Sequence, residues 1–196
     1  MDPEIRMTQM GRKRATYADL EAAPPDKLAE LIDGELFVSP RPGGRHAKAA
    51  GLLYADLVRE FDGDPLQPPR RQRWWLLFEP ELHLDNDVVV PDIAGWKRER
   101  WTDVPDVTAF TDVPDWVCEV TSPGHRRLDR TLKLPLYARH GVQHVWLVDP
   151  ADKSLEVIKL DRSAKWKTLV FKSPVAPQRV PPFDEASLDL GRWWIK

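Results

Sequence analysis

Only one cysteine occurs among the 196 residues, so the chain cannot form an intrachain disulfide. Cys118 lies in an apolar stretch that predicts a core strand, and a reducing interior therefore suits the protein. No run approaches the roughly 18 apolar residues that a membrane span needs. The first residues, Met1 to Arg14, also lack the apolar core of a signal peptide. We therefore expect a cytoplasmic protein that does not contact a membrane.

An excess of positive charge is also absent. The chain has 29 Lys and Arg residues against 31 Asp and Glu, a formal net charge of −2 and an isoelectric point near 6.2. These values exclude a generally basic nucleic-acid-binding surface, so any contact with DNA must come from local clusters. The candidate clusters are Arg70, Arg71 and Arg73, the group from Lys97 to Arg100, and the pair Arg126 and Arg127.

Segments typical of interdomain linkers are absent, and the sequence contains no internal repeat. The 19 prolines are scattered through expected turns. A chain of 196 residues is long enough for one well-buried domain. We expect a flexible tail over residues 1–14 and a single domain over residues 15–196. Strand and helix patterns alternate along this domain, which is typical of the α/β class.

Local patterns predict the main elements of the domain. A short helix begins at Thr16, and an Asp33-Gly34 pair between two apolar runs is a strong hairpin signal. Apolar residues at helical spacing predict a helix from about Arg45 to Phe61. Further strands are expected at 73–78, 81–84, 88–94, 116–121, 145–148, 155–160 and 166–171. A helix from about 126 to 140, ending before Gly141, links the strands at 116–121 and 145–148.

A glutamate stands in the middle of the apolar strand at 116–121. Because strand side chains alternate between faces, Trp116, Cys118 and Val120 point one way, and Glu119 and Thr121 point the other. Burying an unpaired carboxylate costs on the order of several kcal/mol. We therefore expect a cationic group to meet Glu119.

The preceding strand, at 88–94, is likewise apolar except for an aspartate. Pro91 cannot donate to a sheet ladder, so this strand is expected to bend or to lie at an edge there. Such a bend would aim Asp92 toward the face of Glu119. Two carboxylates at the ends of neighbouring strands form an oxygen-rich site for a hard cation such as Mg²⁺ or Mn²⁺.

The helix that follows supplies a cation. Asp129, Lys133 and Tyr137 are spaced four apart and lie on one face of it. An adjacent apolar stripe is expected to face the core, and Pro135 is expected to remove one hydrogen bond and kink the helix. A lysine held near two carboxylates could act on a phosphate or a water molecule at the same site.

Several motifs carry a resemblance to a known family. They are Glu30-Leu31-Ile32-Asp33-Gly34-Glu35-Leu36, Pro91-Asp92, Glu119-Val120-Thr121-Ser122-Pro123, the helix with Asp129, Lys133 and Tyr137, and Gly141-Val142 before Val145 to Pro150. In this order and spacing the chain, from about Thr16 onward, resembles the Uma-two-type restriction endonuclease family of the PD-(D/E)XK nuclease superfamily. The resemblance implies a restriction-endonuclease-like mixed sheet flanked by helices, with an N-terminal β-hairpin. It implies a metal-dependent endonuclease that hydrolyses phosphodiester bonds in DNA.

The resemblance also implies roles for individual residues. Asp92, Glu119 and the backbone carbonyl of Val120 would hold Mg²⁺ or Mn²⁺, and Lys133 would be catalytic. In the orthodox superfamily pattern the lysine stands two residues after the glutamate, where this chain has Thr121. Lys133 would therefore substitute for it from the helix.

The resemblance adds two further expectations. Glu30, on the first hairpin strand, would join the site as an additional acidic residue. A homodimer would place two sites on the two strands of duplex DNA. Two apolar residues near the C-terminus, Trp193 and Trp194, favour the same interpretation if they are exposed.

Each assignment has a structural alternative. Asp92 could cap a turn, and Glu119 could pair with an arginine. Lys133 could be only the salt-bridge partner of Asp129. His46, at the start of the second helix, could contact a phosphate or remain a solvated surface residue.

Tyr137 could hydrogen-bond the substrate or anchor its helix. Trp74 and Trp75 could stack on bases, although a half-buried strand explains them as well. At the level of function, the alternatives are a catalytically silent DNA-binding or interaction module of the same fold, and a nuclease acting on RNA or small nucleotides.

Overall fold

The computed structural model of the chain describes residues 14–62, 73–122, 126–160, 166–173 and 176–194, so nearly all of the predicted N-terminal tail lies outside the described residues. Helix α1 (Tyr17–Glu21) begins after Thr16, whose N–H and hydroxyl both donate to Asp19 Oδ2 at 2.7 Å. Strands β1 (Lys27–Ile32) and β2 (Glu35–Pro40) form the predicted antiparallel hairpin. The turn residues Asp33 and Gly34 both have positive φ, 55° and 77°, as a type I′ turn requires.

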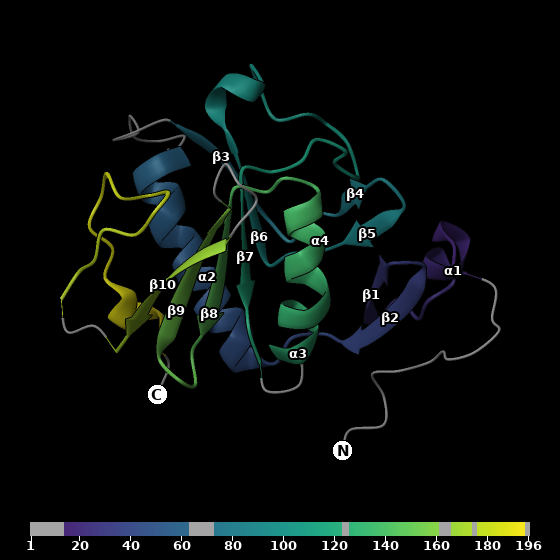
Figure 1. Ribbon diagram of the computed structural model, residues 1–196, viewed down its shortest axis with the longest axis horizontal. Coiled ribbons are helices and arrows are strands. Elements are labelled where there is room, and N and C mark those ends of the chain that lie inside the picture. The colour runs from purple at the N-terminus through teal and green to yellow at the C-terminus, as the bar shows by residue number, and fades with distance from the viewer. Residues whose placement is uncertain (1–13, 63–72, 123–125, 161–165, 174–175, 195–196) are drawn as a thin grey trace.

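Two sheets make up the β structure (Figure 1). The smaller sheet has the order β2-β1-β5-β4, completed by β4 (Leu82–Leu84) and β5 (Asp87–Val89). The larger has the order β10-β9-β8-β7-β6-β3, and its β7–β8 pair is parallel while its other pairs are antiparallel. It is therefore the expected mixed sheet. Its strands are β3 (Trp74–Phe78), β6 (Ile93–Lys97), β7 (Trp116–Val120), β8 (His144–Asp149), β9 (Ser154–Leu160) and β10 (Trp166–Lys172).

The strand predicted at 88–94 is not continuous, and that expectation is wrong. Strand β5 ends at Val89 and belongs to the small sheet, whereas β6 begins at Ile93 and belongs to the large sheet. The intervening residues include Pro91, which has no N–H for a ladder. The predicted bend is confirmed, and it marks the passage of the chain from one sheet to the other.

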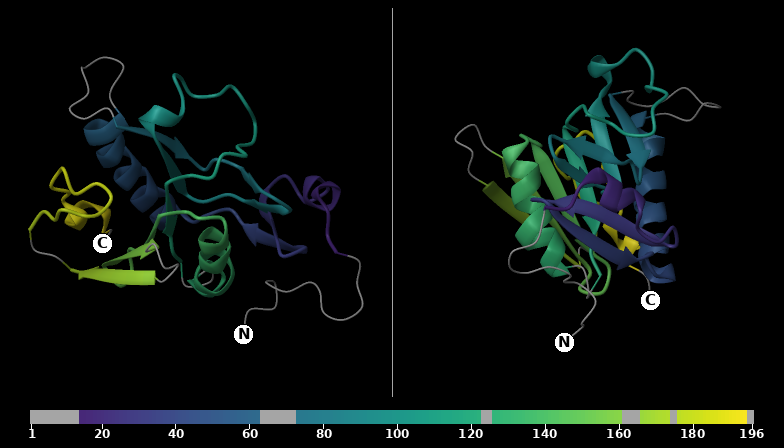
Figure 2. Two further views of the ribbon diagram at one scale, coloured as in Figure 1. Left: turned by 45° about the horizontal axis from the view of Figure 1, so that its top comes forward. Right: turned by 90° about the vertical axis from the view of Figure 1, so that its right-hand side faces the viewer.

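Helices cover both faces of the large sheet (Figure 2). On one face lies α2 (Gly44–Leu57), extended by a π-helical turn, η1 (Val58–Asp62). On the other lies a continuous helical segment made of α3 (Arg126–Leu128), the π-helical turn η3 (Asp129–Lys133) and α4 (Leu134–Arg139). Trp116, Cys118 and Val120 pack in the core on the α2 side, while Val117 packs with residues of α4. The predicted alternation of β7 is confirmed.

The C-terminal segment folds back onto α2. After the 3₁₀ turn η2 (Arg98–Arg100) in the middle of the chain, a second 3₁₀ turn, η4 (Leu190–Trp193), lies near the end. Trp193 is fully buried and donates from Nε1 to Asp56 Oδ2 at 3.0 Å, and Trp194 is half-buried against the same core. The expectation that these two residues are exposed is therefore wrong. Among the described residues, no helix combines the length and the apolar character that a membrane crossing requires.

Candidate active site

Asp92 lies in the break between the two sheets, next to the end of β7. Its Oδ1 is 2.6 Å from Nε2 of His46 in the first turn of α2, and its Oδ2 accepts a hydrogen bond of 2.6 Å from the Val120 N–H. Burial lowers the pKa of His46, but the hydrogen bond and charge of Asp92 outweigh it, so that this pKa is raised. The N–H and C=O of one strand residue point to the same edge, so the Val120 carbonyl also faces the Asp92 side.

Glu119 is buried on the α4 side of β7. Its Oε1 accepts a hydrogen bond of 2.5 Å from the Tyr137 hydroxyl and lies 2.9 Å from Nζ of Lys133. The cation expected for Glu119 is therefore a lysine of the next helix, not an arginine. Tyr137 is also fully buried, so it fixes the Glu119 side chain from inside the core.

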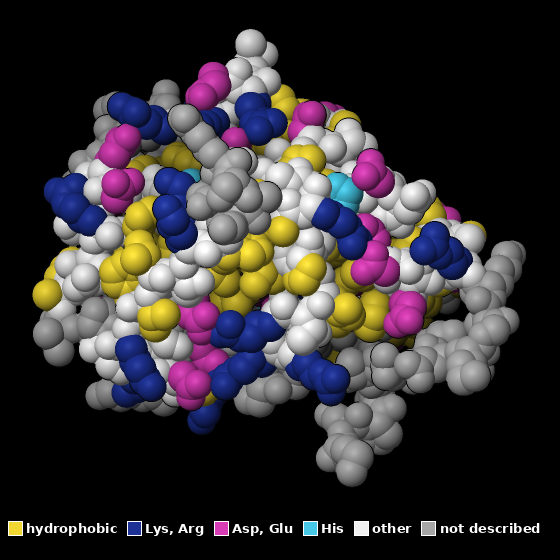
Figure 3. Space-filling view, in the orientation of Figure 1, with side chains coloured by type: hydrophobic (Ala, Val, Ile, Leu, Met, Phe, Trp, Pro, Cys, Tyr) yellow, Lys and Arg dark blue, Asp and Glu magenta, His cyan; other side chains and the backbone are white. Residues whose placement is uncertain are grey.

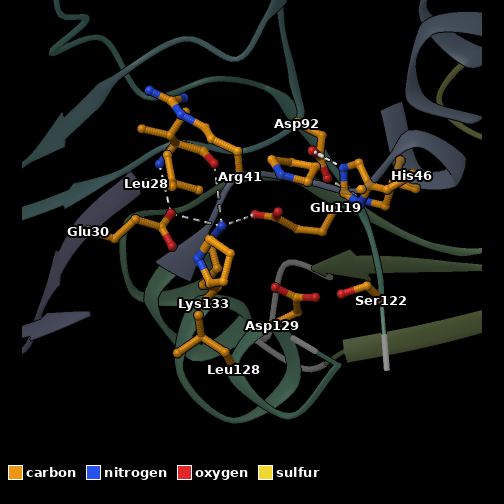
Figure 4. Close-up of a pocket in the computed structure, with 15 residues that line it drawn as sticks. Leu28, Glu30, Arg41, His46, Asp92, Glu119, Ser122, Leu128, Asp129 and Lys133 are labelled. Carbon is orange, nitrogen blue, oxygen red and sulfur yellow. Dashed lines mark hydrogen bonds and ion pairs between the residues drawn. The ribbon is translucent and has the colours of Figure 1, made fainter. Parts of the chain in front are cut away.

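Glu30 completes the surroundings of this lysine. Lys133 Nζ lies 2.9 Å from Glu30 Oε1, which also accepts a 2.9 Å hydrogen bond from the Val90 N–H. Figure 4 shows the ammonium of Lys133 between the carboxylates of Glu30 and Glu119. The lysine therefore connects the small sheet, the large sheet and the helix in one buried network.

The helix that carries Lys133 departs from α geometry at this place. Residues Asp129–Lys133 form a π-helical turn, in which the N–H of Leu134 bonds to the carbonyl of Asp129. Pro135 follows and lies in the first turn of α4, where its missing N–H is tolerated. Asp129, Lys133 and Tyr137 are all buried, so the predicted common face is confirmed. Turns of this kind often occur at functional sites.

Asp129 is the residue whose place sequence reasoning missed. Rather than serving as the surface partner of Lys133, it is buried and lines the same cavity as Asp92 and Glu119. Burial, opposed by Lys133 and reinforced by Asp92 and other carboxylates, raises the pKa of Asp129 to about 7. The four-residue spacing from Lys133 was the available signal, but it could not show that the face is buried.

Negative groups outnumber positive ones in this network. Burial raises the pKa of Glu119 well above its ordinary value; Lys133 opposes this effect, and Asp129, Asp92 and Glu30 add to it. For Lys133 burial alone would lower the pKa, but Glu119 and Glu30 outweigh burial and raise it well above its ordinary value. Excess negative charge in a buried place makes the site receptive to an added cation.

A cavity gives these groups access to the outside. In Figure 4 the carboxylates of Asp92, Glu119 and Asp129 lie around it. Residues from both sheets and both helical layers line it, and they include Leu28, Glu30, Arg41, His46, Asp92, Glu119, Ser122, Leu128, Asp129 and Lys133. Figure 3 shows Lys and Arg side chains along the lower edge of the molecule, interspersed with Asp and Glu.

Comparisons with known proteins agree with this architecture. A family model described as "Putative restriction endonuclease", named Uma2, matches residues 14–191. The chain belongs to the Uma2 family. A crystal structure described as that of a putative nuclease belonging to DUF820, from Anabaena variabilis, is 23% identical in sequence, with a TM-score of 0.72. The match covers 91% of this chain and 97% of that one and confirms the fold. A comparison with curated proteins found no match.

For a Uma2 protein, a divalent cation is the cofactor to test against the geometry. The described residues contain no ready cluster of three or more His, Cys, Asp or Glu side chains that could hold a metal. The donors that face the cavity are instead two strand carboxylates, Asp92 and Glu119, together with the Val120 carbonyl. Oxygen ligands of this kind suit a hard cation, and the excess negative charge around them favours one. The residues present therefore fit a hard divalent cation.

Other residues considered for the Uma2 site lie apart from the cavity. Thr121 shares the sheet face of Glu119, but its hydroxyl donates to Asp149 Oδ2 at 3.3 Å and lines a different cavity. Arg126 forms ion pairs with Asp149 and Asp152 at that second cavity. Thr121 is therefore not part of the Lys133 network.

The basic residues that the sequence predicted to bind nucleic acid have different surroundings in the structure. Arg73 lies 3.1 Å from Glu185. Arg127 is exposed on α3, next to Leu128 of the cavity wall. Arg70 and Arg71 lie outside the described residues. In the second group, Arg98 pairs with Asp62 and stacks on Trp75, and Arg100 pairs with Asp115.

Proposed function

We propose that the chain is a metal-dependent endonuclease that hydrolyses phosphodiester bonds in DNA. The observation that carries the proposal is the ammonium of Lys133, held 2.9 Å from both Glu30 and Glu119 in a cavity shared with Asp92. A lysine held beside strand carboxylates at a cavity can stabilise the charge that develops on a phosphate during hydrolysis. Membership of the Uma2 family supports the same chemistry.

In this proposal the cation is held by Asp92, Glu119 and the Val120 carbonyl, with Glu30 assisting directly or through water. When bound, Mg²⁺ or Mn²⁺ supplies charge that offsets the negative phosphate and lowers the pKa of water. His46 and the Val120 N–H hold the two oxygens of Asp92 in place.

The remaining residues of the network act on the substrate or on each other. Lys133 stabilises the negative charge that develops on the phosphate oxygens and orients the attacking water. Tyr137 holds Glu119 through its hydroxyl. In the orthodox pattern this role belongs to a lysine of the strand, at the position that Thr121 occupies here. Lys133 performs it from the helix instead.

The test is cleavage of plasmid DNA with Mg²⁺ or Mn²⁺, comparing the native chain with Glu119→Gln. This substitution keeps the shape of the side chain and removes its charge. Glu99→Gln, an identical change at an exposed position of η2, is the matched control. We expect cleavage by the native chain and the control, and none by Glu119→Gln.

Two results would contradict the proposal. Cleavage in the presence of a chelator would exclude metal dependence. DNA binding by the native chain without cleavage under any metal would favour the catalytically silent module. Replacing the plasmid with RNA of similar length separates a DNA nuclease from an RNA nuclease.

Homodimerisation remains a prediction based on the family resemblance, because Trp193 is buried in its own core. We propose a symmetric pair that would place one site on each strand of duplex DNA. Sedimentation at micromolar concentration would show a dimer, and a strictly monomeric species would exclude it.

A further inference from the structure

Three exposed basic residues stand at the start of α2, beside the candidate active site. Arg41 lines the cavity itself, and Arg45 and Lys48 follow within the first turns of the helix. We call these three residues the basic rim. His46, in the same turn, holds Asp92 at 2.6 Å, so this turn of α2 lies beside a proposed metal ligand, while Arg45 and Lys48 project from other sides of the helix.

Within the described part of the chain, the rim residues form no ion pair with an acidic side chain. Most other arginines near the two sheets do, and their charges are therefore already used inside the molecule. The arginines with such partners are Arg59, Arg73, Arg98, Arg100, Arg126, Arg130, Arg139 and Arg192. The rim thus offers positive charge that is free to meet an external anion.

The basic rim does not stabilise its own helix. The N-terminus of a helix carries a partial positive charge, so cations in the first turn are unfavourable by about 0.3–1 kcal/mol each. Arg45 stands in that turn, which has no acidic residue, and the N-cap position is Gly43, which supplies no side-chain cap. Helix stability therefore does not explain the basic residues at this place, whereas an anionic ligand does.

The position of the rim favours an extended anion. Arg45 and Lys48 are three residues apart, about 4.5 Å along the helix axis, and so lie on the same side of α2. Arg41 precedes the helix and lines the cavity, and Arg45 and Lys48 are exposed on the outer side of the first turns of α2. In Figure 1 this end of α2 lies close to the end of β2 and to α3. With a net charge of −2, the whole protein does not attract a polyanion, and only a local surface can.

We propose that Arg41, Arg45 and Lys48 bind the phosphate backbone of the DNA strand that flanks the cleaved bond. The inference rests on the proposed function for the cleavage step, but the binding can be measured without it. The proposed surface also differs from the clusters that the sequence suggested for DNA binding, because Arg73 and Arg126 of those clusters are paired with acidic residues.

The experiment measures binding of a fluorescein-labelled duplex of about 20 base pairs by fluorescence anisotropy, with salt varied between about 50 and 200 mM. All proteins carry Glu119→Gln, so that no cleavage occurs. The rim variant adds Arg45→Gln and Lys48→Gln. The matched control adds Lys159→Gln and Lys172→Gln, the same charge change at exposed positions of β9 and β10.

We expect the rim variant to bind on the order of tenfold more weakly, and its slope of log affinity against log salt to fall by about two, one for each lost phosphate contact. The control should bind as the parent does. Because Arg45 disfavours the helix, the melting temperature of the rim variant should be equal to that of the parent or higher.

Equal binding by the rim variant and the control would overturn the inference, and so would a parent that does not bind the duplex at low salt. If the binding result is as expected but the native chain cleaves no plasmid with Mg²⁺ or Mn²⁺, the proposed cleavage fails and the rim stands as a DNA-binding surface. The two ideas therefore fail by different measurements.

Discussion

Replacing Asp129 with asparagine should make the metal-free protein more stable at alkaline pH. The residue is 5% exposed and shares its cavity with other carboxylates. Burial is the largest cause of its raised pKa, and the charge of Lys133 only partly compensates. Asparagine keeps the shape of the side chain and cannot ionise, so it removes the need to bury this charge.

The magnitude follows from the change of pKa between the unfolded and folded chains. The pKa rises from 3.8 to about 7, and each pKa unit is worth about 1.4 kcal/mol. The folded chain binds this proton more tightly, so the stability present below about pH 4 is lost as the pH rises to about 7. The full loss is about 4 kcal/mol above pH 7, and less than half of it has occurred by pH 5.

The measurement is urea unfolding at pH 5 and pH 8 in the presence of a chelator. Asp129→Asn should exceed the native chain in unfolding free energy at pH 8 by a few kcal/mol, and by clearly less at pH 5. Asp106→Asn, the same change on an exposed loop, is the control. The reasoning is refuted if Asp129→Asn shows no gain at pH 8 or an equal gain at both pH values.

Three further predictions concern the site and its support. Lys133→Met should lower DNA cleavage at least about a hundredfold, because it removes a charge used in the transition state; cleavage at the native rate would show that Lys133 is structural. Mn²⁺ should raise the melting temperature of the native chain, by an amount corresponding to about 2.7 kcal/mol at 100 times its Kd. Asp92→Asn or Glu119→Gln should remove this rise, and an unchanged rise would place the metal elsewhere. Arg139→Gln should lower the unfolding free energy in urea by about 1–3 kcal/mol, because it leaves the buried Asp87 without its 2.5 Å partner; an unchanged midpoint would contradict that.

Much of the local structure could be predicted from the sequence. Asp33 and Gly34 predict their hairpin turn because few residues adopt positive φ at low cost. The alternation along β7 assigns Glu119 to the face opposite Cys118 because strand side chains have a period of two. Because an unpaired buried carboxylate is costly, a cationic partner for Glu119 could also be expected, and the structure supplies it as Lys133.

Other features depend on packing between segments that are distant in the sequence. Residues 88–94 have the pattern of a single strand, yet their two halves pair with different sheets, because only the assembled sheets determine which ladder each half joins. Trp193 lies in a terminal segment whose sequence predicts an exposed tail. The end of the chain instead folds back, and the Trp193 indole donates a hydrogen bond to Asp56. Asp129 has the spacing of a surface salt-bridge residue, and only the cavity shows that it is buried.

The sequence by itself determined which side chains share a strand face or a helix face, because the periods of strands and helices are properties of the local backbone. Only the tertiary structure decided which of those faces meet. Glu30 reaches Lys133 because the small sheet packs against the helical segment that carries the lysine. Whether a charged residue is free or paired was likewise decided by packing, since ion pairs join residues from separate elements. The basic rim and Arg126 both place positive charge near the start of a helix. Only the folded structure shows that Arg126 has an acidic partner.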